Sequence, residues 1–206
     1  MTVRMASPTK LIFLPGAAGS PDFWRPVSDL LVHPAKRALL GWPGFDGVPR
    51  DPGISSLSDL VRIATDQMDQ PCALIAQSMG GVIAVSAALE RPELLTHIVL
   101  AVTSGGIDMS DAEDWRGSFW KANPQAPSWF ADYLEDLSAR IPSIEAPALL
   151  LWGDEDPLSP ISVGRRLEAL LPHSRLQVLQ GGRHDLVVKL APQVARLIGE
   201  HLGAAA

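Results

Sequence analysis

Apolar residues in this chain form short continuous runs, and longer segments with apolar residues on one helical face lie between them. The short runs predict strands, at residues 10–14, 37–42, 72–76, 97–102, 148–152 and 175–179. The periodic segments predict helices, at residues 21–32, 56–68, 79–90, 161–171 and 186–202. Strands that are apolar throughout are typical of a sheet buried on both faces. Because helices separate most successive strands, the sequence predicts an α/β fold, with a parallel sheet of about six strands flanked by helices.

One interval interrupts this alternation. The stretch between residues 102 and 148 is far longer than one crossover needs, and its middle is rich in aromatic residues. We predict two short helices here, forming a helical cap at residues 107–142 that is inserted into a single domain of residues 1–206.

Composition narrows the classes of partner and compartment. The net charge is −6 and there is no cluster of basic residues, which argues against nucleic acid and anionic membrane as partners. The one cysteine, Cys72, cannot form an internal disulfide and is expected to be inert core. The first residues, MTVRMASPTK, lack the apolar segment of a signal peptide, and no apolar run is long enough to span a bilayer. We therefore expect a cytoplasmic protein that acts on a small molecule, and the sequence leaves a homodimer open.

Chemically active side chains follow three of the predicted strands. QSMGG comes after the third strand, GDEDP after the fifth and GGRHD after the sixth. In an open parallel sheet, ligands bind outside the carboxyl ends of the strands. A serine, an aspartate and a histidine are therefore expected at the same edge, in that chain order.

Ser78 lies at the apex of a predicted strand-to-helix turn. The pattern is A-x-S-x-G, formed by Ala76, Ser78 and Gly80, where the usual motif is G-x-S-x-G. Such a turn is cramped and needs small residues two positions to either side of the serine. A methyl group still fits where a larger side chain would not. A purely structural turn would need glycine, but not a serine at its apex.

Four stretches together resemble the α/β-hydrolase superfamily. They are LIFLPGAAGS, LIAQSMGGVIA, LLLWGDEDPLSP and GGRHD, and the resemblance extends over residues 10–202. The chain is most similar to the small carboxylesterase branch. This resemblance implies a serine hydrolase that cleaves a small or medium ester through an acyl-enzyme, without a cofactor. The sequence has no Cys/His cluster or H-E-x-x-H pattern that would predict a metal site.

The resemblance also implies roles for individual residues. Ser78 would be the nucleophile, and His184 the base that takes its proton. Asp156 fits the G-x-x-D spacing of the acid that orients the histidine, while Asp154 in the same loop and Asp108 after the fourth strand remain alternatives.

The oxyanion hole would be formed by two backbone N–H groups. One is that of Met79, at the start of the helix that follows Ser78. The other is that of Ala17, in a loop where Pro15 stands in place of the histidine of many relatives. The alternative for this loop is an ordinary glycine-rich connection between a strand and a helix.

Three tryptophans in the insert are candidates for substrate binding. Trp115, Trp120 and Trp129 could line an acyl or aromatic pocket, or could simply dock the insert onto the core.

Two other functional readings stay open. Relatives with the same three residues catalyse C–C bond hydrolysis or lyase reactions. The other alternative is a non-catalytic member of the superfamily that uses the fold for binding or signalling. A serine in place of aspartate argues against the haloalkane dehalogenases and epoxide hydrolases of the superfamily.

Overall fold

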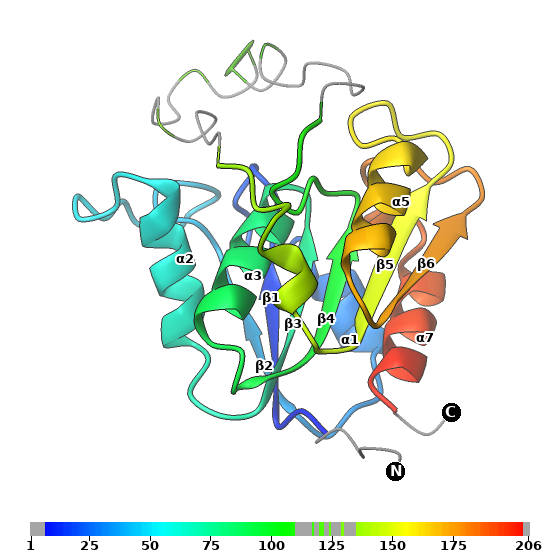
Figure 1. The fold of residues 1–206 in the computed structure, drawn as a ribbon. Helices are drawn as coiled ribbons and strands as arrows, with labels where there is room; N and C mark the ends of the chain where they lie inside the picture. The colour runs from blue at the N-terminus through cyan, green and yellow to red at the C-terminus, as the bar shows by residue number, and fades with distance from the viewer. Residues whose placement is uncertain are drawn as a thin grey trace.

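Six parallel strands form the sheet of this protein, in the order β2-β1-β3-β4-β5-β6 (Figure 1). The computed structural model describes residues 7–109, 117, 120, 121, 124, 129 and 135–203. The strands are β1 (Lys10–Leu14), β2 (Lys36–Leu39), β3 (Cys72–Gln77), β4 (Leu95–Ala101), β5 (Ala148–Gly153) and β6 (Ser174–Leu179). The predicted fold class is confirmed.

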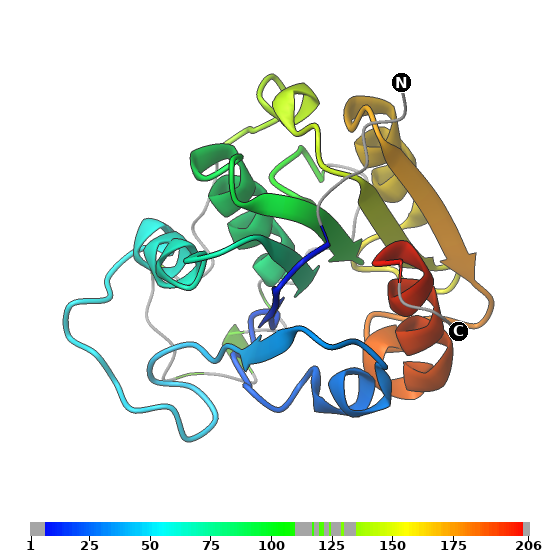
Figure 2. The same ribbon diagram turned by 90° about the horizontal axis from the view of Figure 1, so that it is seen from below.

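Helices cover both faces of the sheet. They are α1 (Arg25–Leu30), α2 (Leu57–Asp66), α3 (Met79–Glu90), α5 (Ile161–Leu170), α6 (Leu186–Lys189) and α7 (Ala191–His201), with a short 3₁₀ helix, η2 (Ile141–Ser143). Viewed along the layers, α2, α3, η2 and α5 lie on one side of the sheet, and α1, α6 and α7 lie on the other (Figure 2). The central strands are thereby enclosed, as their unbroken apolar sequences predict.

Burial follows the position of each strand in the sheet. All residues of β3, β4 and β5 are buried, and so is β1 apart from Lys10. The edge strands β2 and β6 are partly exposed. Because every pair is parallel, all the loops that follow the strands gather at one edge, which is uppermost in Figure 1.

Prolines account for two differences from the predicted helices. The helix expected at residues 21–32 begins only at Arg25, with Pro26 in its first turn. The helix expected at residues 186–202 is divided at Leu190, and Pro192 lies in the first turn of α7. Proline has no N–H to give to the carbonyl four residues earlier, so it is tolerated at a helix start but interrupts an interior.

Most of the predicted cap at residues 107–142, including its two expected helices, lies outside the described residues. At its ends, Ile107 and Leu137 are buried, and the Leu137 N–H donates to the Gly106 carbonyl at 2.9 Å. The division into a core and a cap therefore stays a prediction. Among the described helices, none combines the length and apolar character that a membrane span requires.

Candidate active site

Ser78 occupies a strained turn between β3 and α3. Its backbone has φ 53° and ψ −126°, a conformation that costs a non-glycine residue about 1–3 kcal/mol. The turn is held by a hydrogen bond from the Ser78 N–H to the Ala101 carbonyl at 3.0 Å. A Cβ on Gly80 would lie 2.4 Å from the Pro15 carbonyl oxygen, so only glycine allows β1 and α3 to approach this closely. Strain of this kind is common at functional sites.

The structure brings together the three side chains expected at this edge of the sheet. The Nε2 atom of His184 lies 3.0 Å from the Oγ atom of Ser78. On the other side of the ring, Nδ1 lies 2.8 Å from Oδ2 of Asp156. The Asp156 side chain is fully buried, whereas the His184 side chain is 29% exposed. A hydrogen-bonded line thus runs from a buried carboxylate through an imidazole to the serine hydroxyl.

The two aspartates of the loop after β5 have different partners. Oδ1 of Asp156 accepts hydrogen bonds from the N–H groups of Leu158 at 2.9 Å and Ser159 at 3.3 Å, which leaves Oδ2 facing His184. Asp154 instead accepts from the Gly181 N–H at 2.7 Å. Asp154 therefore braces the turn that precedes His184, while Asp156 contacts the imidazole itself. The other alternative acid, Asp108, lies exposed after β4.

Sequence analysis did not identify two polar residues that lie at this edge of the sheet. Gln77 is buried at the end of β3, and its Nε2 donates to the His184 carbonyl at 3.1 Å. Thr103 is buried just after β4, and its hydroxyl donates to the Ser78 carbonyl at 2.5 Å. The available signal was a polar residue at the end of a strand that is otherwise buried, because such a residue needs a hydrogen-bond partner.

The two expected N–H donors belong to Met79, which follows Ser78 in the chain, and to Ala17, whose neighbour Gly16 lies close to Ser78. Met79 is the first residue of α3, where the helix dipole favours negative charge. Ala17 follows Gly16, on which a Cβ would lie 3.1 Å from the Ser78 Cβ. In the described part of the chain, neither the Ala17 N–H nor the Met79 N–H is hydrogen-bonded to a protein acceptor. Both N–H groups therefore remain candidates for the oxyanion hole.

The predicted aromatic binding residues are only partly placed. Trp120 and Trp129 are half-buried and pack against the hydrophobic core. Trp115 lies outside the described residues. Core contact agrees with the docking alternative, and a role in substrate binding stays a prediction.

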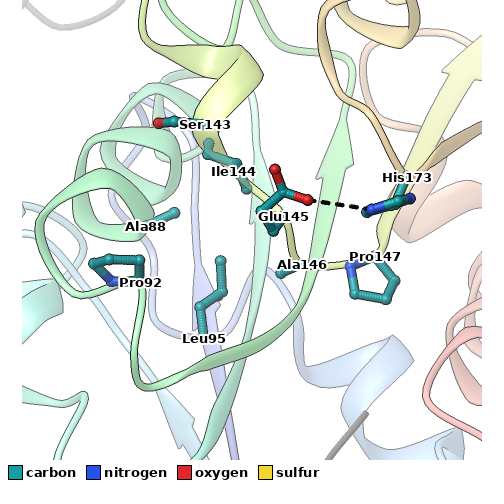
Figure 3. A pocket seen from close by; sticks show the side chains of 9 residues that line it. All are labelled: Ala88, Pro92, Leu95, Ser143, Ile144, Glu145, Ala146, Pro147 and His173. Carbon is teal, nitrogen blue, oxygen red and sulfur yellow. Dashed lines mark ion pairs between the residues drawn. The ribbon is translucent and has the colours of Figure 1, made fainter. Parts of the chain in front are cut away.

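A separate cavity of about 660 Å³ lies at the opposite end of the sheet, where β4 and β5 begin (Figure 3). Its wall is mainly apolar, with Ala88, Leu95 and Pro147 among the lining residues. Glu145 and His173 form an ion pair of 3.3 Å at this cavity, and both side chains are largely exposed. Among the described residues, no three His, Cys, Asp or Glu side chains are grouped closely enough to hold a metal ion.

Comparison with known proteins gives sequence relatives that are hydrolases. The "Uncharacterized hydrolase YugF" of Bacillus subtilis is 27% identical over 175 residues, and the match spans only 63% of each chain. The 2-hydroxy-6-oxononadienedioate/2-hydroxy-6-oxononatrienedioate hydrolase of Cupriavidus pinatubonensis is 25% identical over 92% of this chain and 83% of its own. The pimeloyl-[acyl-carrier protein] methyl ester esterase of Nitrosomonas europaea is 22% identical over 81% of this chain and 84% of its own.

Solved structures share the fold. A lipase-esterase related protein from Clostridium acetobutylicum matches with a TM-score of 0.76 and 16% identity, over 96% of both chains. The sequence model of the alpha/beta hydrolase family matches residues 11–196, a span that runs from β1 into α7 and includes Ser78, Asp156 and His184. The chain belongs to the alpha/beta hydrolase family.

Proposed function

We propose that this protein is a serine hydrolase that cleaves small or medium esters through a covalent acyl-enzyme. One observation carries the proposal: the His184 imidazole contacts both the Ser78 hydroxyl, at 3.0 Å, and the buried Asp156 carboxylate, at 2.8 Å. A free serine hydroxyl is a weak nucleophile at neutral pH, and an adjacent base is what activates it.

In the first half of the reaction, Ser78 Oγ attacks the ester carbonyl while His184 Nε2 takes its proton. Asp156 keeps the other ring nitrogen protonated and stabilises the imidazolium that forms. The negative charge that develops on the carbonyl oxygen is held by the N–H groups of Met79 and Ala17. His184 then returns the proton to the leaving alcohol, and the acyl group stays on Ser78.

In the second half, water replaces the alcohol. His184 takes a proton from the water, which attacks the acyl carbonyl, and the same two N–H groups hold the second oxyanion. Breakdown of this intermediate releases the acid and returns the proton to Ser78. Every group required for this cycle comes from the loops at the carboxyl edge of the sheet or from the first residue of α3.

The relatives support a hydrolase, and the choice of ester hydrolysis within that class is our proposal. One relative is named as a methyl ester esterase, although another is named for the hydrolysis of a dienedioate. The insert after β4 is short, which favours a small or medium acyl group over a long chain. Hydrolysis of a C–C bond is therefore the alternative that the experiment must distinguish from ester hydrolysis.

A fluorophosphonate probe tests the proposal directly, because it reacts with an activated serine. Wild type should be labelled, and Ser78→Ala should lose both labelling and ester hydrolysis, the latter by about 10⁴-fold or more. Ser58→Ala is the matched control, since Ser58 is exposed on α2, a helix that carries none of the candidate site residues, and should behave as wild type.

A chain-length panel then separates the reaction classes. p-Nitrophenyl acetate and butyrate should be turned over faster than the octanoate. Labelling that persists in Ser78→Ala would overturn the proposal. Labelling at Ser78 with negligible turnover of all the esters would assign the site to C–C hydrolysis or lyase chemistry instead.

A further inference from the structure

Trp42 is fully buried, and it contacts the loop after β1 through two hydrogen bonds. Its indole Nε1 donates to the Gly16 carbonyl at 3.0 Å. Its backbone N–H donates to the Gly19 carbonyl at 2.9 Å. The Gly16 carbonyl also accepts from the Gly19 N–H at 3.0 Å, which closes a tight turn over Ala17. The loop is therefore fixed mainly at one carbonyl, that of Gly16.

That carbonyl belongs to the same peptide group as the Ala17 N–H. A peptide group is planar, and in the trans form its C=O and N–H point in opposite directions. No cis peptide bond occurs among the described residues. When the indole of Trp42 holds the Gly16 carbonyl, the Ala17 N–H must therefore point away from the indole. Turning the peptide over would break the bonds from both the indole and Gly19.

The orientation of the Gly16–Ala17 peptide group matters because this group lies close to Ser78. A Cβ placed on Gly16 would lie 2.4 Å from Gln77 Oε1 and 3.1 Å from the Ser78 Cβ, so the peptide begins beside the serine. The loop has proline at position 15, which has no N–H and cannot brace the loop with a polar side chain.

We propose that Trp42 is a positioning residue that aims the Ala17 N–H into the oxyanion hole and increases its strength as a donor. This inference rests on the proposed function. A hydrogen bond accepted by a carbonyl polarises its peptide group, which makes the N–H of the same group a better donor. Trp42 acts on the reaction only through this peptide and does not touch the substrate.

Trp24 offers a matched control. It is also buried, 1% exposed, and its indole Nε1 donates to a backbone carbonyl of the same segment, that of Leu14, at 2.9 Å. The Leu14 carbonyl, however, shares its peptide group with the nitrogen of Pro15, which carries no hydrogen. Removing the Trp24 indole N–H therefore removes a bond of the same kind from a peptide that cannot bind an oxyanion.

The experiment compares Trp42→Phe with Trp24→Phe. We expect Trp42→Phe to lower kcat for p-nitrophenyl butyrate by about tenfold to a hundredfold, below the full loss of a donor, while KM changes little. Trp24→Phe should lower the melting temperature and leave kcat near that of wild type. A second Trp42 variant carries 3-benzothienylalanine, introduced by amber suppression, because it keeps the bicyclic shape and replaces the N–H by sulfur.

An alkyl trifluoromethyl ketone supplies a readout that loss of stability alone would not change. Ser78 Oγ adds to its carbonyl carbon, the C=O π electrons pass to the oxygen as an oxyanion, and the serine proton moves to His184. The affinity of the enzyme for this ketone should fall in the same proportion as kcat in both Trp42 variants, and it should stay unchanged in Trp24→Phe.

Two results would overturn the inference alone, with Ser78 still labelled by the fluorophosphonate probe. One is equal kcat values for the Trp42 and Trp24 variants, and the other is unchanged ketone affinity in the Trp42 variants. Failure of wild type to label at Ser78 would overturn the proposed function, and the inference with it.

Discussion

The hydroxyl of Thr103 donates a hydrogen bond to the backbone carbonyl of Ser78, at 2.5 Å. The backbone carbonyl of Thr103 in turn accepts a hydrogen bond from Ser159 Oγ at 3.5 Å, and the Ser159 N–H donates to Asp156. Thr103 therefore connects the turn that carries the serine with the loop that carries the acid. It supports a backbone conformation at Ser78 that would otherwise be unfavourable.

Replacing Thr103 with valine should impair both folding and activity. Valine keeps the shape but removes one of the two donors to the Ser78 carbonyl, the other being the Gly81 N–H at 2.9 Å. It also leaves the buried Gly105 N–H without its acceptor, the Thr103 hydroxyl, so the free energy of unfolding should fall by about 1–3 kcal/mol. Because the serine would be held less precisely, kcat should fall by about tenfold or more. Urea denaturation and steady-state ester hydrolysis measure the two effects. Thr103→Ser keeps the hydroxyl and should recover most of the rate; failure of this variant to recover more than valine would contradict the role of the hydrogen bond.

The aspartates at positions 154 and 156 should respond differently to the same change. Asp156→Asn removes the carboxylate beside His184 and favours the wrong imidazole tautomer, so kcat should fall by about 10⁴-fold. Asp154→Asn can still accept from the Gly181 N–H, so its kcat should stay within about threefold of wild type. Steady-state kinetics with p-nitrophenyl butyrate distinguish the two. A larger loss in Asp154→Asn than in Asp156→Asn would transfer the acid's role to Asp154.

Local pattern and topology were enough to place the main side chains of the site. Ser78 and Asp156 follow buried apolar strands and His184 follows the partly exposed edge strand β6, and parallel strands bring such positions to one edge whatever their separation in the chain. The sequence also contained the reason for the late start of α1, in Pro26, and for the division between α6 and α7, in Pro192. Propensity alone did not reveal them, because the surrounding residues keep a helical period through both prolines.

The supporting contacts could not be predicted, because they depend on which backbone groups meet in three dimensions. Trp42 was assigned to the second strand, yet β2 ends at Leu39. The Leu40 N–H still bonds to Phe13 of β1, but the Trp42 N–H turns to Gly19 in a loop. Nothing in the apolar pattern marks that change of partner, and the same holds for the carbonyl contacted by Gln77.

Gly80→Ala should disturb the serine turn through a steric clash. The added Cβ would lie 2.4 Å from the Pro15 carbonyl oxygen, a backbone atom that cannot rotate away, so the free energy of unfolding should fall by about 3 kcal/mol. The rate of fluorophosphonate labelling should fall as well. Gly47→Ala is the control: φ is +81° there and no atom lies within 4 Å of the added Cβ, so we expect a cost of about 1 kcal/mol and a normal labelling rate. Equal labelling rates in both variants would contradict the steric account.

Two histidines at the amino end of the sheet, the buried His97 and the half-buried His201, should make the protein less stable in mild acid. Burial, with the nearby His97 and Arg175, lowers the pKa of His201 to about 4. The His97 ring packs edge-on against His201 with centroids 5.1 Å apart, and burial lowers its pKa too. In the unfolded chain both would titrate near the usual histidine pKa of about 6.5.

The sign of the effect follows from the protons bound in each state. Between about pH 6.5 and pH 4 the unfolded chain binds more protons than the folded one, so the free energy of unfolding falls as the pH falls through this range and is unaffected above it. For His201, which is not fully enclosed, we expect a loss of about 1–2 kcal/mol. Urea denaturation near pH 7 and near pH 5 measures the difference, which should shrink in His201→Leu because the residue no longer titrates. The control is His173→Gln, which replaces an exposed histidine beside Glu145 and should keep the wild-type difference between the two pH values. If this variant reduced the difference as much as His201→Leu does, the pH dependence would not come from His97 and His201.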